Sequence, residues 1–201
     1  SMYNGALAGV SLAGDRFFYV NPLESNGDHH RQAWYGCACC PSQISRFLPS
    51  IGNYIYGTSD KALWVNLFIG NTTEVTIDGK KVVMKQETDY PWDGLVKLTV
   101  TSEQPLGKEL RIRIPGWCKS YTLSVNGNKV DSTTDKGYTV IKEWKTGDLI
   151  VLNMDMPVEK VSADPRVRQN TGKRALQHGP LVYCLEETDN TKDFADLALT
   201  P

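Results

Sequence analysis

The sequence predicts a mainly β protein: an antiparallel, jelly-roll-like β-sandwich with an N-terminal hairpin and one short helix. From about residue 53 onward, short runs rich in β-branched and aromatic residues alternate with glycine or asparagine turns. Only one segment has a helical period. Many short strands at such spacing are typical of sandwiches and jelly rolls.

The first 50 residues provide the hairpin and the helix. Residues 10–12 and 16–20 flank a turn at residues 13–15, which predicts a β-hairpin. Pro41 suits the first turn of a helix over residues 41–48. The apolar residues that follow it have the i, i+3, i+4, i+7 spacing of one helical face: Ile44, Phe47, Leu48 and Ile51.

The remaining runs predict strands, and two dipeptides mark tight hairpins between them. Asp78-Gly79 and Asn126-Gly127 each stand between alternating runs, where a two-residue turn needs left-handed backbone. The predicted strands are residues 53–58, 62–69, 72–78, 82–88, 95–101, 109–114, 121–125, 139–144 and 149–154.

Composition excludes several classes of partner. The 201 residues suffice for one domain, or for one domain with part of another. A formal charge of −1 provides no basic field for nucleic acid and no polybasic membrane patch. No run approaches the ~20 apolar residues of a membrane helix. We therefore expect neither nucleic acid nor a membrane as a partner.

The five cysteines are unevenly placed, because Cys37, Cys39 and Cys40 crowd together while Cys118 and Cys184 stand alone. A secreted disulfide framework spreads its cysteines, and adjacent cysteines bond only in a strained ring. Reduced thiols favour a reducing compartment such as the cytoplasm. The first residues lack the features of a signal peptide, and Ser1 before Met2 suggests a piece of a longer protein.

The cysteine cluster lies just before the predicted helix, where backbone N–H groups and the helix dipole stabilise a thiolate. A thiolate is both a nucleophile and a soft metal ligand, so metal or catalytic use competes with inert, buried thiols. His29 or His30 could complete a closed zinc site, although adjacent histidines in a polar loop are more often solvated. Alternatively, the chain supplies only part of a site.

Four stretches resemble glycoside hydrolase family 127, the β-L-arabinofuranosidase family formerly called domain of unknown function 1680. The double cysteine before proline, together with Asn-Pro-Leu-Glu-Ser, is the most specific part of the resemblance. The stretches are residues 3–12 (Tyr-Asn-Gly-Ala-Leu-Ala-Gly-Val-Ser-Leu), 17–25 (Phe-Phe-Tyr-Val-Asn-Pro-Leu-Glu-Ser), 34–41 (Trp-Tyr-Gly-Cys-Ala-Cys-Cys-Pro) and 177–186 (Gln-His-Gly-Pro-Leu-Val-Tyr-Cys-Leu-Glu).

The resemblance implies a zinc-dependent retaining glycosidase with an (α/α)6-barrel followed by β-sandwich domains. It makes Cys39 the nucleophile and a zinc ligand, Cys40 a second zinc ligand, and Tyr3 a neighbour of the carbohydrate substrate. The family's other zinc ligands, in a Glu-x-Cys motif, and its acid/base glutamate come from an earlier barrel segment. No Glu-x-Cys occurs in this sequence.

We therefore predict a fragment that acts on plant-type glycans only within a longer enzyme and is inactive alone. Residues 1–52 are expected to end the barrel, 53–187 to form the sandwich, and 188–201 to be a tail or linker. Surfaces that normally pack on the barrel would then favour self-association, for example as a homodimer.

Several single residues have two interpretations. Glu24 is a candidate acid, but capping of its loop is the simpler role, and Cys37 suits packing beside the site better than ligation. Cys118 and Cys184 are expected to be buried strand thiols. A different class of function, a non-catalytic carbohydrate-binding or interdomain module, rests on the strand tryptophans: Trp64, Trp92, Trp117 and Trp144.

Overall fold

The computed structural model describes residues 2–22, 24–25, 27–33, 36–186 and 190. Within them the predicted fold class is confirmed, since the chain is mainly β with three sheets and short helices. Contacts divide the chain into two units, residues 38–157 and residues 1–37 with 158–201. Each unit is described by itself below.

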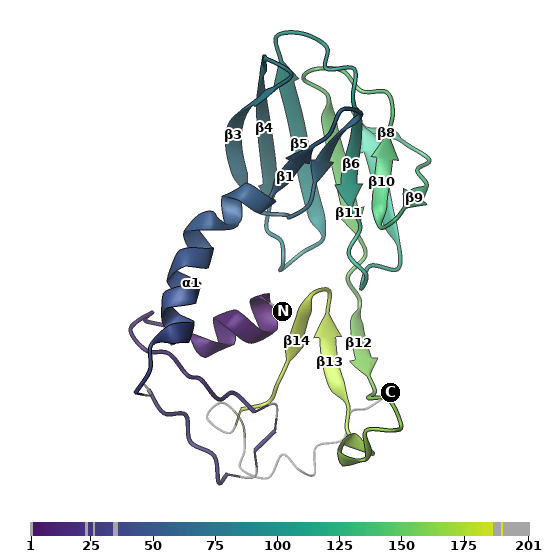
Figure 1. The fold of residues 1–201 in the computed structure, drawn as a ribbon. Coiled ribbons are helices and arrows are strands. Elements are labelled where there is room, and N and C mark those ends of the chain that lie inside the picture. Colours follow the sequence, from purple (N-terminus) through teal and green to yellow (C-terminus); the bar gives the residue numbers. More distant parts are fainter. Residues whose placement is uncertain (1, 23, 26, 34–35, 187–189, 191–201) are drawn as a thin grey trace. The chain divides into compact units, whose positions relative to one another are not determined.

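Two sheets of the 38–157 unit form the β-sandwich (Figure 1). Their strand orders are β1-β2-β6-β10-β9 and β3-β4-β5-β11-β7-β8, and only β2 and β6 pair in parallel among the described strands. The jelly-roll connectivity stays a prediction. The strands are β1 Tyr56–Thr58, β2 Ala62–Val65, β3 Asn71–Ile77, β4 Lys80–Thr88, β5 Leu95–Ser102, β6 Glu109–Arg113, β7 Tyr121–Val125, β8 Asn128–Lys129, β9 Thr134–Asp135, β10 Tyr138–Ile141 and β11 Leu149–Met154.

Alternation along the strands builds one core between the sheets. In β5, for example, Val96, Leu98 and Val100 are buried while Lys97 between them is exposed. Inward residues of both sheets belong to a single cluster of buried side chains. The largest fully buried members are Leu63, Met84, Leu98, Leu110, Ile112, Leu123, Ile150 and Leu152.

Both predicted tight turns are confirmed. Asp78 and Gly79 have φ of 51° and 74°, and Asn126 and Gly127 have φ of 50° and 82°, as two-residue hairpins require. A third turn of this kind, with Lys136 at φ 48° before a glycine, joins β9 to β10 and was not predicted.

Helix α1 (Cys39–Ser50) confirms the predicted helix and begins earlier than Pro41. None of its residues is buried, so its apolar face is not part of the sandwich core. The prediction of a strand over residues 53–58 was wrong at its start. A 3-10 helix, Ile51–Tyr54, continues the helical turn, and only Tyr56–Thr58 is extended.

The second unit joins both ends of the described chain. A π-helix (Met2–Ala6) and a 3-10 helix (Leu7–Gly9) lead to the predicted hairpin, which consists of one bridge between Val10 and Phe17. The sheet β12-β13-β14 was not among the predicted strands: β12 Val158–Val161, β13 Ala175–His178 and β14 Leu181–Tyr183.

The observed units meet at residues 37/38 and 157/158, whereas the sequence predicts domain boundaries at 52/53 and 187/188. The predicted domains themselves stay a prediction, and all but residue 190 of the tail lies outside the described residues. No helix among the described residues combines the length and the apolar character that a membrane span requires.

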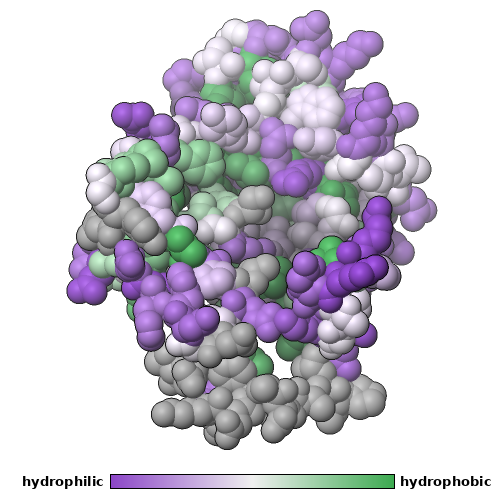
Figure 2. Space-filling model, turned by 60° about the horizontal axis from the view of Figure 1, so that its bottom comes forward, coloured by the Kyte–Doolittle hydropathy of each residue, from purple (hydrophilic) through white to green (hydrophobic). Residues whose placement is uncertain are grey.

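The surface mixes hydrophilic and hydrophobic side chains, as the face drawn in Figure 2 shows. Several large apolar side chains are exposed. Among them are Phe47 and Leu48 on α1, at 41% and 42% exposure, and Trp92 on the β4–β5 loop, at 69%.

Candidate functional site

Helix α1 places the two adjacent cysteines in its first turn. Cys39 is exposed, Cys40 is partly buried, and their Sγ atoms lie 3.6 Å apart. A disulfide requires about 2.05 Å, so these sulfurs are not bonded to each other. Adjacent residues on a helix usually point in different directions, and the pair nevertheless brings its sulfurs together.

The start of the helix is left without a side-chain cap, because Ala38 precedes it. Ser42 instead turns back on the first turn. Its Oγ donates to the carbonyl of Cys39 at 2.9 Å, and its backbone N–H donates to that of Ala38 at 3.3 Å. Because Cys39 and Cys40 are the first two residues of α1, the positive end of the helix dipole lies at their thiols.

The sulfur separation fits two ligands of one zinc ion. Two thiolates at ~2.3 Å from a tetrahedral zinc would be about 3.8 Å apart, close to the 3.6 Å between Cys39 and Cys40. Structural zinc takes four protein ligands, yet no group of three or more His, Cys, Asp or Glu gathers among the described residues. The local closed site with His29 or His30 thus gains no support.

The other candidate residues belong to the second unit. Tyr3 is half-buried in the π-helix, and this burial raises the pKa of its hydroxyl. Glu24 forms an ion pair with Lys173, which favours a structural role over that of an acid. Cys37 is exposed, and its carbonyl accepts a hydrogen bond from the Tyr19 hydroxyl. Tyr3 thus lies in a short helix, whereas Glu24 and Cys37 lie in loops.

Comparison with known families shows the family to which this chain belongs. Residues 1–53 match the model described as "Beta-L-arabinofuranosidase, GH127 catalytic domain". Residues 62–156 match the GH127 middle domain, and residues 158–201 the family 127 C-terminal domain. The chain belongs to glycoside hydrolase family 127.

Relatives in family 127 support this assignment. A curated non-reducing end β-L-arabinofuranosidase from Bifidobacterium longum subsp. longum is 39% identical over 96% of this chain. A crystal structure of a family 127 β-L-arabinofuranosidase from Geobacillus stearothermophilus T6 gives a TM-score of 0.87 at 47% identity over 94% of this chain. Another family 127 β-arabinofuranosidase gives 0.88 at 41% over 94%. The chain spans 32% of the length of the curated relative, and 32% and 33% of those two structures.

The two remaining cysteines of this family 127 chain, Cys118 and Cys184, lie outside α1 in the sequence. Cys118 follows a turn and is partly buried, and this burial, aided by Asp155, raises the pKa of its thiol. Cys184 follows β14 and is exposed. The prediction of buried strand thiols was therefore wrong for Cys184 in both respects and for Cys118 in its placement. A turn at Gly116 and Trp117 directly precedes Cys118, and β14 ends at Tyr183, one residue before Cys184.

Most of the tryptophans proposed for sugar stacking are committed to other contacts. The Arg111 guanidinium lies 5.0 Å above the Trp64 ring, and the Tyr138 ring meets that indole edge-on. Trp117 stacks on Tyr90. Trp144 packs against the core and donates to the Lys108 carbonyl at 2.8 Å. Of the four, Trp92 is the most exposed.

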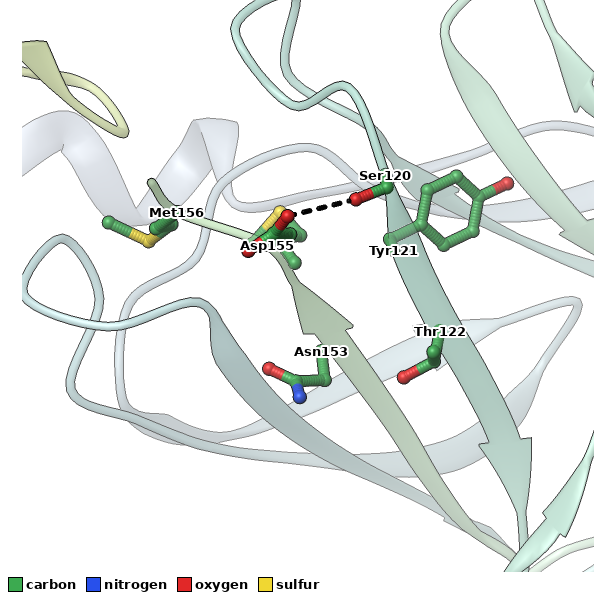
Figure 3. A pocket seen from close by; sticks show the side chains of 7 residues that line it. Ser120, Tyr121, Thr122, Asn153, Asp155 and Met156 are labelled. Atoms are coloured by element: carbon green, nitrogen blue, oxygen red, sulfur yellow. Dashed lines mark hydrogen bonds between the residues drawn. The ribbon is translucent and has the colours of Figure 1, made fainter. Parts of the chain in front are cut away.

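Sequence reasoning missed a polar groove on the sandwich (Figure 3). It measures about 270 Å³ and lies where β7 begins and β11 ends; we call it the β7–β11 groove. No motif signals it, because its two strands are distant in sequence. Its lining residues are Ser120, Tyr121, Thr122, Asn153, Met154, Asp155 and Met156.

Hydrogen bonds order the rim of this groove. The Ser120 hydroxyl donates to Asp155 Oδ2 at 3.2 Å, and the Asp155 backbone N–H donates to the Ser120 carbonyl at 3.0 Å. The Tyr121 hydroxyl pairs with Ser132 and Thr134 at 3.2 and 3.0 Å. Although burial opposes them, hydrogen bonds to Tyr121 hold the pKa of its hydroxyl below the ordinary value.

Proposed function

We propose that this chain contributes the nucleophile and two metal-binding thiols to a retaining glycosidase that hydrolyses β-L-arabinofuranosides of plant-type glycans. The carrying observation is the Cys39–Cys40 pair at the start of α1, with its sulfurs 3.6 Å apart. Family membership and the activity stated for the Bifidobacterium relative support β-L-arabinofuranosides as the substrate class.

The thiols suit both roles. Exposure leaves Cys39 reachable by a substrate, and its place in the first turn of α1 puts it at the positive end of the helix dipole. Cys40, which is partly buried beside it, suits a ligand held in place by its helix. A bound zinc ion would hold the thiols deprotonated near neutral pH.

The reaction then follows the double displacement of retaining glycosidases. Cys39 Sγ attacks the anomeric carbon, forming a C–S bond as the glycosidic C–O bond breaks. The leaving oxygen takes a proton from an acid outside this chain. Water then displaces the sulfur, returns the proton to that acid's conjugate base, and releases the sugar with its configuration retained.

Because the Glu-x-Cys motif is absent from the 201 residues, we infer that the chain alone is inactive. The test measures hydrolysis of an aryl β-L-arabinofuranoside by this chain and by the longer protein to which we assign it. We expect no turnover by the chain. In the longer protein, Cys39→Ala should reduce kcat by about 10³-fold or more.

Matched variants sharpen this experiment. Cys40→Ala should lower both the zinc content and the activity, and a chelator should abolish activity. Cys184→Ala changes an exposed thiol that is not part of the cysteine pair and should leave activity unchanged. Turnover by the 201-residue chain that disappears in Cys39→Ala would refute the proposed inactivity, and an active Cys39→Ala longer protein would refute the nucleophile.

We also propose that the isolated chain self-associates through the exposed apolar face of α1, where Phe47 and Leu48 lie. Sedimentation velocity should show a mass that rises with concentration. Phe47→Glu should shift the equilibrium toward monomer at least tenfold, whereas Thr101→Glu, which adds the same charge on an exposed strand position, should not. A monomer at every concentration would exclude this association.

A further inference from the structure

The β7–β11 groove has a composition that suits a neutral polyol. Its exposed side chains, Ser120, Thr122, Asn153 and Asp155, offer two hydroxyls, one amide and one carboxylate, and no basic side chain lines it. Asp155 would repel anionic ligands, whereas a carboxylate, an amide and hydroxyls together both donate to and accept from sugar hydroxyls. A concave site with a few convergent polar groups is the usual form of a small-ligand site.

Two of these polar groups are positioned side by side with unused hydrogen-bonding capacity. Thr122 and Asn153 pair directly across β7 and β11, so their side chains share one face of the sheet (Figure 3). Both residues are exposed, and neither side chain hydrogen-bonds to another part of the chain that the structure describes. Directly paired Cβ atoms lie about 5 Å apart, a span that two side chains can use to hold neighbouring sugar hydroxyls.

A fixed loop presents Trp92 next to this end of the sandwich. The Trp92 backbone N–H donates to the Asp89 carbonyl at 2.9 Å, and the Leu95 N–H donates to Asp93 Oδ1 at 2.9 Å. The loop is tied to the groove strand because the Met154 N–H donates to the Gly94 carbonyl at 3.0 Å.

Gly94 shows how closely this loop approaches the groove strand. A Cβ on Gly94 would lie 2.0 Å from the carbonyl oxygen of Met154, which lines the groove. Trp92, two residues earlier, is nevertheless 69% exposed. A large aromatic side chain on an already ordered backbone offers apolar contact area at a small entropic cost, as binding sites use it.

We propose that the β7–β11 groove and Trp92 form a non-catalytic binding site for a neutral oligosaccharide. Asn153, Thr122 and Asp155 bind the sugar hydroxyls, and the Trp92 indole contacts the apolar C–H face of a neighbouring residue of the glycan. The site is independent of the role of Cys39, because every group it uses lies on the sandwich.

The test titrates the isotope-labelled 201-residue chain with L-arabino-oligosaccharides while NMR spectra are recorded, with cello-oligosaccharides as comparators. The Asn153 side-chain amide and the Trp92 indole N–H should shift, with a dissociation constant on the order of 1 mM for an arabino-oligosaccharide or a comparator. Asn153→Ala and Trp92→Ala should each weaken binding about tenfold, and Cys39→Ala should leave it unchanged.

Matched controls separate binding from folding. Asn128→Ala removes an exposed asparagine of the same sheet, and Trp64→Phe alters an indole covered by Arg111; both should bind like the parent chain. The proposal is overturned if neither sugar class shifts these signals, if the shifts lie only outside the sandwich, or if Asn153→Ala binds normally. A loss of binding restricted to Cys39→Ala would likewise overturn it while supporting the proposed function.

Discussion

Asp148 is a residue whose charge the fold uses directly. Its carboxylate accepts a hydrogen bond from the Lys145 backbone N–H at 2.7 Å and another from Asn126 Nδ2 at 2.8 Å. These bonds, led by the one from Lys145, lower the pKa of Asp148. The side chain thus holds the loop before β11 against the β7–β8 turn.

The lowered pKa predicts how stability depends on pH. Since the folded pKa is below the unfolded one, the contribution of Asp148 is fully present above the unfolded pKa of about 3.9 and disappears as pH falls through the folded pKa. Asp148→Asn should therefore unfold more easily than the parent at pH 7. Urea denaturation should show this difference shrinking below about pH 4.

A control and a contrary result complete this test. Asp131→Asn removes an exposed carboxylate that forms no hydrogen bond or ion pair with another described residue, so it should have little effect at either pH. A stability difference between Asp148→Asn and the parent that stays constant down to pH 2 would contradict the assigned cause.

Single residues also show how far sequence reasoning reached at the candidate site. Cys39 and Cys40 were found because their signal is local: a cysteine pair before a proline and an apolar helical period. The β7–β11 groove was missed because Thr122 and Asn153 become neighbours only through strand register. The roles assigned to Cys39 and Cys40 in catalysis and metal binding stay predictions.

At the scale of elements, hairpin turns were predictable wherever the residue chemistry matched the backbone. Asp78 and Asn126 tolerate left-handed backbone, so their turns were recognised. Lys136 has the same backbone, with φ of 48°, but lysine gives no such signal. The sheet of β12, β13 and β14 was missed because β12 is mostly exposed and therefore lacks a clear apolar alternation.

The β9–β10 turn can consequently be improved. Lys136→Asn should stabilise the chain by about 0.5–1 kcal/mol, because asparagine adopts left-handed backbone with less strain. Thermal unfolding should show a higher Tm. Lys129→Asn, the same change on strand β8, should not raise the Tm, and a destabilised Lys136→Asn would show that the turn is not strained.

At the scale of the molecule, the 1–37 and 158–201 unit depends on contacts between distant segments. Asn4 Nδ2 donates to the Pro180 carbonyl at 2.8 Å, and Asn4 Oδ1 accepts from the Val182 N–H at 3.0 Å. One side chain thus fixes the N-terminal π-helix to the β13–β14 hairpin. No local pattern could have predicted these two hydrogen bonds, because their partners are separated by 176 and 178 positions in the sequence.

Removing this link should loosen the N-terminal segment. Asn4→Ala loses two hydrogen bonds, which is worth about 1–3 kcal/mol of local stability. Limited proteolysis should cut the residues near the π-helix several times faster, while the sandwich remains intact. Asn53→Ala replaces an exposed asparagine in the other unit and should leave the cleavage rate unchanged. If Asn4→Ala is cleaved at the same rate as the parent chain, the Asn4 link does not hold the N-terminal segment.

The Asn4 link also has a consequence for biosynthesis. A ribosome adds roughly 5–20 residues per second, so the π-helix emerges about 9–35 s before Pro180 and Val182, its partners 176 and 178 residues later. During that interval the segment must wait while the complete sandwich is synthesised and can fold. Nascent chains stalled before residue 158 should therefore expose it to protease, and chains with β14 outside the ribosomal tunnel should protect it.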